Sequence, residues 1–136
     1  MEINRVFSFG FHDTTITDIQ VLQDRVIFTF RDGLYLLDET GREKSLSLPI
    51  EMHIYIDTSF ASSSLDFIEV RAVGRRETSF PDCERVFDSG TLVGAEVGNL
   101  FYSAFNSTLL FDLTKGRGWF LLEISNCLDV VYKYIE

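Results

Sequence analysis

Hydrophobic and polar residues alternate along most of this chain, and the clearest alternation runs over residues 46–57. Successive side chains of a β-strand point to opposite faces of a sheet, so this period of two predicts a long, half-buried strand. Because Pro49 lacks an N–H group, we expect the strand to begin at a sheet edge or to carry a bulge there. Its apolar face comprises Leu46, Leu48, Ile50, Met52, Ile54 and Ile56, and its polar face comprises Ser47, Pro49, Glu51, His53, Tyr55 and Asp57.

The segment before this strand predicts two hairpins in succession. Residues 26–30 alternate in the same way, and Asp32-Gly33 supplies the positive φ of a tight turn before residues 34–37 return. A second turn over residues 39–42 leads into the long strand. Further upstream, one face of another predicted strand takes Thr15, Thr17, Ile19 and Val21.

The middle of the chain is less regular. Residues 65–73 predict a strand, and residues 74–89 predict a loop with a short helix that begins near Pro81-Asp82. Residues 91–97 predict a strand that Gly94 interrupts, and the pattern over residues 99–105 is ambiguous.

The last third of the chain predicts a three-stranded meander over residues 107–113, 119–124 and 127–135. Turn signals recur about every 8–12 residues, which is typical of a sandwich or barrel. No helical patterns separate the strands, which argues against a parallel sheet. We therefore expect residues 1–136 to form a single domain of the all-β class, with at most one short helix. Its architecture should be an antiparallel sandwich or a partly open barrel of about nine strands.

The composition indicates the size of the hydrophobic core and the charge of the expected partner. The chain has 136 residues, 46% of them apolar, with 13 Phe and a net charge of −9. A chain of this length can bury a single hydrophobic core that is large enough to stabilise the fold without disulfides. Nucleic-acid backbones are bound through Lys and Arg, so the acidic balance argues against a nucleic-acid partner and favours a basic protein partner.

The chain also carries few signs of export or membrane insertion. No apolar run reaches the ~18–20 residues of a membrane span. The N-terminal residues lack the pattern of a signal peptide. The two cysteines, Cys83 and Cys127, are far apart, which is typical of reduced thiols. We expect a cytoplasmic protein without membrane contact.

Candidate catalytic chemistry is sparse. With only His12 and His53 as imidazoles, metal sites and catalytic triads lack ligands, and no phosphate-binding or dinucleotide motif is present. We therefore expect no enzyme activity, no metal and no cofactor. His12 and Asp13 lie at a strand entrance, where Asp commonly accepts a hydrogen bond from the backbone two residues on. We predict a structural role for this pair.

Two clusters of charged residues remain as candidate surfaces. The polar stripe Glu51, His53, Tyr55 and Asp57 projects from one strand face at intervals of about 6–7 Å. Its pattern favours a solvated face, with a partner-binding surface as the second interpretation and acid–base chemistry as the third. The arginine cluster Arg71, Arg75 and Arg76 is interpreted as a salt-bridged surface, because Glu69 and Glu77 are close in sequence.

The run FHDTTITDIQVLQDRVIFTFRDGLYL, residues 11–36, resembles the opening of small bacterial immunity-type proteins of polymorphic and contact-dependent toxin systems. The run WFLLEISNCLDVVYKYI near the C-terminus is similar as well, and together they cover about a third of the chain. The matching positions are His12, Asp13, Ile16, Ile19 and the hairpin Val26–Leu36. The resemblance implies a small, acidic, non-enzymatic protein that blocks a cognate toxin.

Three functions therefore remain open. The leading hypothesis is an acidic binding protein that neutralises a basic toxin domain, with Glu51, His53, Tyr55 and Asp57 as a candidate patch. The alternative is a small-molecule binder whose sandwich encloses an apolar, Phe-lined pocket. The third is self-assembly, for example a homodimer that forms through edge strands.

Overall fold

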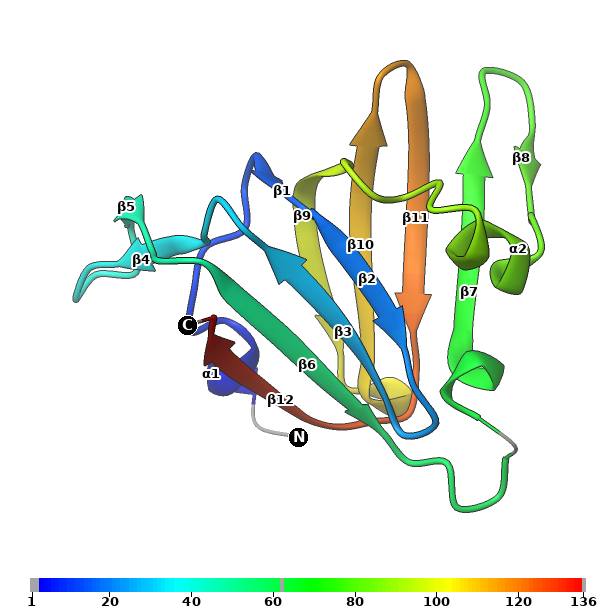
Figure 1. Cartoon of the computed structure of the whole chain (residues 1–136), viewed down its shortest axis with the longest axis horizontal. Helices are drawn as coiled ribbons and strands as arrows, with labels where there is room; N and C mark the ends of the chain where they lie inside the picture. The colour runs from blue at the N-terminus through cyan, green and yellow to red at the C-terminus, as the bar shows by residue number, and fades with distance from the viewer. Residues whose placement is uncertain (1–2, 62, 136) are drawn as a thin grey trace.

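A computed structural model describes residues 3–61 and 63–135, which form a sandwich of two antiparallel sheets with a small separate hairpin (Figure 1). The structure confirms the predicted all-β class. Twelve strands lie within the described residues, and both large sheets are open at their edges. The helical segments there are α1 (Ile3–Val6), α2 (Cys83–Asp88) and two 3-10 turns, η1 (Ser64–Phe67) and η2 (Phe105–Ser107).

The larger sheet has six strands in the order β1-β9-β10-β11-β7-β8. Its long central hairpin, β10–β11, pairs from Leu109 opposite Ile124 to Lys115 opposite Gly118. The outermost strands have only two residues each, which leaves short edges. The strands are β1 (Thr14–Thr15), β7 (Ile68–Val73), β8 (Thr78–Ser79), β9 (Glu96–Ser103), β10 (Thr108–Lys115) and β11 (Gly118–Ile124).

The second sheet has four strands in the order β12-β6-β3-β2, and a hairpin of β4 and β5 projects beside it (Figure 1). The central strand β6 pairs with both β3 and β12. The strands of this sheet are β2 (Asp18–Val21), β3 (Arg25–Phe30), β6 (Ile50–Ile56) and β12 (Cys127–Tyr134). The hairpin consists of β4 (Tyr35–Leu37) and β5 (Glu43–Leu46).

The core lies between the two sheets and is built from their inward-facing residues. Phe28 of β3 and Phe111 of β10 meet across it, with ring centroids 5.0 Å apart, and neither side chain is exposed to solvent. Burying a side chain of this size stabilises the fold by about 1.5–3 kcal/mol. Other side chains that are fully buried include Ile16, Phe30, Leu34, Ile50, Met52, Ile54, Leu92, Leu109, Leu113 and Leu122.

The strand predicted over residues 46–57 is divided in the structure. Its second half is β6, where Ile50, Met52, Ile54 and Ile56 are buried as the alternation indicates. Its first half leaves the sheet, because the backbone N–H of Ser47 donates to the carbonyl of Leu34 at 2.7 Å and the Ser47 hydroxyl accepts from the Leu34 N–H. Pro49 lies in the break between β5 and β6, as its missing N–H group suggests. Leu46 and Leu48 are consequently exposed.

Two predicted strand pairings are wrong. Gly33 has the expected positive φ of 85°, but β4 pairs with β5 and not with β3. The third strand of the predicted C-terminal meander, β12, crosses to the other sheet and pairs with β6. The predicted strand over residues 91–97 begins only at Glu96, because Gly94 lies in a turn with a φ of 91°.

The short helix expected near Pro81-Asp82 is present as α2. Asp82 is its N-cap, and the carboxylate accepts a hydrogen bond from the Glu84 N–H at 3.0 Å. Such a cap satisfies one of the free donors of the first helical turn.

Candidate functional site

The predicted patch Glu51, His53, Tyr55 and Asp57 lies on and just after β6, on the side of the four-stranded sheet that faces away from the core. The His53 side chain is only 6% exposed, so the expectation that it projects as a surface contact is wrong. Neighbouring side chains cover it, because β6 is a central strand with β3 on one side and β12 on the other.

Internal contacts occupy most polar groups of this patch, whereas the buried Nδ1 atom of His53 has no hydrogen-bond partner within the described residues. His53 Nε2 lies 3.1 Å from Glu51 Oε1. Arg25 donates from Nη1 to the Tyr55 hydroxyl at 2.6 Å, and its guanidinium carbon lies 5.2 Å from the centre of the Tyr55 ring. Asp57 accepts hydrogen bonds from the Ser59 hydroxyl and N–H, and these bonds lower the pKa of the Asp57 carboxyl. The predicted partner-binding role of the patch stays a prediction.

A different surface exposes large aromatic side chains. It is the outer face of the six-stranded sheet, where Trp119 of β11 is 46% exposed and Phe101 of β9 is 53% exposed. The strand registers show which residues point outward on this surface, and ten of these form what we call the Trp119 face: Glu69, Arg71, Glu96, Asn99, Phe101, Leu110, Asp112, Trp119, Leu121 and Glu123. These ten include four carboxylates and one guanidinium, a net charge of −3.

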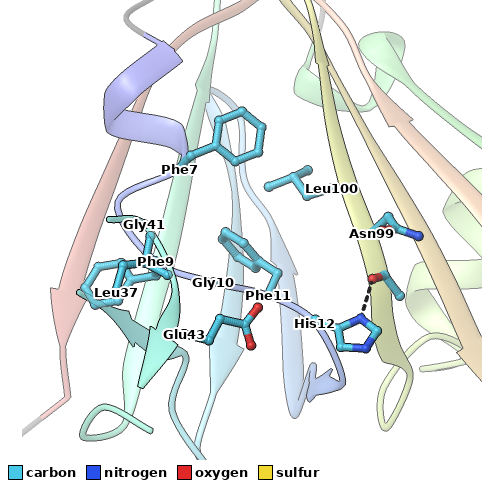
Figure 2. Close-up of a pocket in the computed structure, with 11 residues that line it drawn as sticks. Phe7, Phe9, Gly10, Phe11, His12, Leu37, Gly41, Glu43, Asn99 and Leu100 are labelled. Carbon is cyan, nitrogen blue, oxygen red and sulfur yellow. Dashed lines mark hydrogen bonds between the residues drawn. The ribbon is translucent and has the colours of Figure 1, made fainter. Parts of the chain in front are cut away.

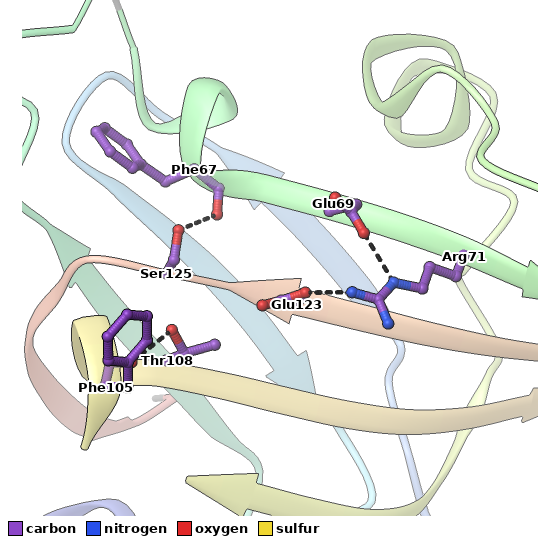
Figure 3. Close-up of polar contacts among 7 residues, drawn as sticks. All are labelled: Phe67, Glu69, Arg71, Phe105, Thr108, Glu123 and Ser125. Atoms are coloured by element: carbon purple, nitrogen blue, oxygen red, sulfur yellow. Dashed lines mark hydrogen bonds and ion pairs between the residues drawn. The ribbon is translucent and has the colours of Figure 1, made fainter. Parts of the chain in front are cut away.

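Polar contacts fix several side chains on the Trp119 face. Arg71 bridges two carboxylates, donating from Nε to Glu69 at 2.7 Å and from Nη2 to Glu123 at 2.9 Å (Figure 3). The hydrogen bond to Glu69 is the largest cause that raises the pKa of the Arg71 guanidinium. This pairing agrees with the interpretation of the arginine cluster as a salt-bridged surface, as far as Arg71 is concerned.

A shallow hollow of about 240 Å³ opens beside the bridging Arg71. Phe101 and Leu110 give it apolar walls, and Glu123 adds a carboxylate. The surface therefore offers an apolar depression with the Arg71–Glu123 ion pair at its rim.

His12 and Asp13 lie just before β1, the edge strand that pairs with β9 on the side opposite β10. The Nδ1 atom of His12 is 3.1 Å from the Gly98 carbonyl oxygen, and Nε2 is 3.3 Å from the Asp13 carboxylate. The carbonyl of Gly98 and the charge of Asp13 raise the pKa of His12. Asp13 itself adopts a φ of 60° at the entrance to β1. This geometry supports the predicted structural role of the pair, which stays a prediction.

A surface pocket of about 290 Å³ lies next to His12, and we call it the Glu43 pocket (Figure 2). Its lining includes three of the phenylalanines, whereas Phe28, Phe30 and Phe111 fill the core. The residues that line it are Phe7, Phe9, Gly10, Phe11, His12, Leu37, Gly41, Glu43, Gly98, Asn99 and Leu100. The hollow that phenylalanines line thus opens at the surface, not between the sheets.

Other classes of site have few candidate residues. Within the described residues, no group of three or more His, Cys, Asp or Glu side chains could hold a metal ion. Over the same residues, no helix combines the length and apolar character needed to cross a bilayer. Cys83 and Cys127 are free, and burial raises the pKa of Cys127 to about 12.

Comparison with known proteins gives no match: no family model matches the chain, and no match occurs among the curated proteins or the solved structures. The resemblance to immunity-type proteins therefore stays a prediction.

Sequence reasoning missed the Trp119 face. Its outward positions on the central hairpin include Leu110, Trp119 and Leu121, and residues of this kind are normally assigned to a core. The sequence signal that could have identified this face is the alternation over residues 108–124, in which Asp112 and Glu123 share the face of Trp119.

Proposed function

We propose that this chain is a non-enzymatic binding protein that uses the Trp119 face to bind a basic protein. The observation that carries the proposal is the exposure of Trp119 and Phe101 on a sheet face with a net charge of −3. Trp and other large aromatic residues are enriched at the centres of protein interfaces, where they contribute most of the binding energy. Surrounding carboxylates select a partner of opposite charge.

The Trp119 face fits this role better than the patch predicted from the sequence. Both outward aromatic rings of the Trp119 face are accessible, whereas His53 is buried and Tyr55 is already bonded to Arg25. Covering the exposed part of each ring contributes a hydrophobic gain in proportion to the apolar area that is removed from water.

The class of partner that we propose is a toxin domain whose surface is basic, as the resemblance to immunity-type proteins implies. The net charge of −9 for the whole chain would steer such a partner toward it. Steered association predicts an association rate that falls as salt is added. We place the complex in the cytoplasm, where the free thiols of Cys83 and Cys127 stay reduced.

Site-specific photo-crosslinking tests the proposal. A photoreactive phenylalanine derivative would replace Phe101 in one variant and Leu128 in the matched control. Leu128 is a comparable choice, because it is 57% exposed and lies on β12 of the other sheet. We expect position 101 to crosslink a basic protein in extracts of the source cells, with a yield that drops when salt is raised. Crosslinks that form from position 128 and not from position 101 would refute the proposal.

The predicted homodimer is a separate matter and stays a prediction. The longest strand at a sheet edge is β12, and a second copy would pair there. Light scattering over a concentration series distinguishes a dimer from a monomer.

A further inference from the structure

We propose that the Glu43 pocket binds a small organic cation, an ammonium group carried on an aromatic or branched aliphatic body. This site is distinct from the Trp119 face, with which it shares only Asn99, and the inference does not depend on the proposed function.

Apolar side chains from three separate segments form the walls of the pocket. Phe7, Phe9 and Phe11 come from the segment that follows α1, Leu37 ends β4, and Leu100 belongs to β9. The volume of about 290 Å³ is enough for a body of one aromatic ring with a short chain. The walls therefore select an apolar body of limited size.

The Glu43 carboxylate, on the exposed strand β5, is the acidic group of the pocket, and the nearby titratable group that feels its charge is His12. It makes no hydrogen bond and no ion pair with any residue in the described part of the chain. Figure 2 shows it beside Gly10, between Leu37 and His12. A bound ammonium group would supply Glu43 with hydrogen-bond donors and a positive charge.

Gly10 makes room for this carboxylate. A Cβ atom at position 10 would lie 2.7 Å from Glu43 Cγ and 2.8 Å from Glu43 Oε1. Two backbone hydrogen bonds with Tyr35, of 2.8 and 3.0 Å, hold Gly10 in place. The position of the Glu43 side chain in the pocket thus depends on the missing side chain of Gly10.

His12 does not compete for the same ligand. Each of its ring nitrogens faces an acceptor, the Gly98 carbonyl or the Asp13 carboxylate, so the doubly protonated ring can donate to both. Asp13 and Glu43 both raise the pKa of His12, so two carboxylates face one imidazole, and the His12 N–H groups are not free to receive an anion. The Glu43 carboxylate makes no hydrogen bond to the described part of the chain, which leaves it open to a cationic ligand.

Titration with matched small probes tests this inference. Phenethylamine is the cationic probe, and 3-phenylpropionate is a control of similar shape with the opposite charge. We expect phenethylamine to shift the backbone amide NMR signals of Gly10, Gly98 and Leu100, and to bind at least about tenfold more tightly than the acid. Equal affinity for the two probes, or no shift up to about 20 mM amine, would overturn the proposal.

Two variants and one control assign the effect to Glu43. Glu43→Gln and Gly10→Ala should each weaken amine binding by about tenfold, the first by removing the charge and the second by displacing it. Glu39→Gln, an exposed carboxylate in the turn of the same hairpin, should leave binding unchanged. If Glu43→Gln binds the amine as tightly as the parent chain, the assignment is wrong. If the amine does not bind, the proposed partner-binding role of the Trp119 face still stands. The two proposals can therefore be refuted separately.

Discussion

The indole Nε1–H of Trp119 donates a hydrogen bond of 2.6 Å to the Oδ1 atom of Asp112, across the central hairpin of the six-stranded sheet. The same carboxylate accepts from the Asn99 amide at 3.4 Å through its other oxygen. These contacts hold the indole in one position while it stays exposed. A side chain that is already ordered, such as this indole, loses less conformational entropy when a partner binds.

Replacing Asp112 tests this contact. Asp112→Ala should lower the free energy of unfolding by about 1 kcal/mol, because the hydrogen bond to a charged group is lost at a partly exposed site. Urea denaturation measures the change. Thr114→Ala is the control on the same strand face, and a cost equal to that of Asp112→Ala would show that the indole contact contributes nothing.

The contact of Phe111 with Phe28 predicts a much larger effect in the core. Phe111→Ala should cost about 3–5 kcal/mol, because it removes a fully buried ring and leaves a cavity. Leu110→Ala, at the neighbouring outward position, should cost far less. Denaturant midpoints for both variants check this, and similar losses at the two positions would contradict the assignment of faces on β10.

Two glycines with nearly the same φ angle should respond differently to alanine. Gly33 and Gly41 have φ angles of 85° and 83°, but a Cβ at Gly33 would lie 2.2 Å from the Ser47 carbonyl oxygen, whereas nothing lies within 4 Å at Gly41. Gly41→Ala should cost about 1 kcal/mol from backbone strain alone. Gly33→Ala should cost about 3 kcal/mol or more. Equal costs would mean that the close approach of residues 33 and 47 is absent in solution.

His12 should stabilise the fold in a pH-dependent way. Its pKa is raised in the folded chain, first by the Gly98 carbonyl and then by Asp13. A raised pKa gives stability that is fully present below the unfolded pKa of about 6.5 and is lost as the pH rises through the folded value. The difference in melting temperature between the parent chain and His12→Ala should therefore be larger at about pH 5.5 than at about pH 8.5. A difference of zero at both pH values would refute the structural role.

Local sequence patterns predicted the elements of this fold better than their partners. The alternation over Ile50, Met52, Ile54 and Ile56 indicates a strand with one buried face wherever that strand lies in a sheet. The pairing of β12 with β6 has no local signal, because β12 alternates equally well beside β11. The choice of partner depends on the core between the sheets, which forms from contacts distant in sequence.

The same dependence on contacts distant in sequence explains why the sequence did not predict the Trp119 face. The sequence pointed to the stripe of Glu51 and His53 because polar residues in a strand suggest a solvent-exposed face. It did not point to Trp119, because exposed and buried aromatic residues look alike in a pattern. Only the registers of β9, β10 and β11 show that Trp119 and Phe101 share a face with Asp112.

The affinity of the crosslinked basic partner for matched surface variants tests the central claim most directly. Phe101 and Leu128 are similarly exposed apolar residues on different sheets, and each would be replaced by serine. The account predicts that Phe101→Ser raises the dissociation constant at least about tenfold, while Leu128→Ser changes it by less than about twofold. Binding that survives Phe101→Ser intact, or that fails with Leu128→Ser instead, would contradict the assignment of the Trp119 face as the partner-binding surface.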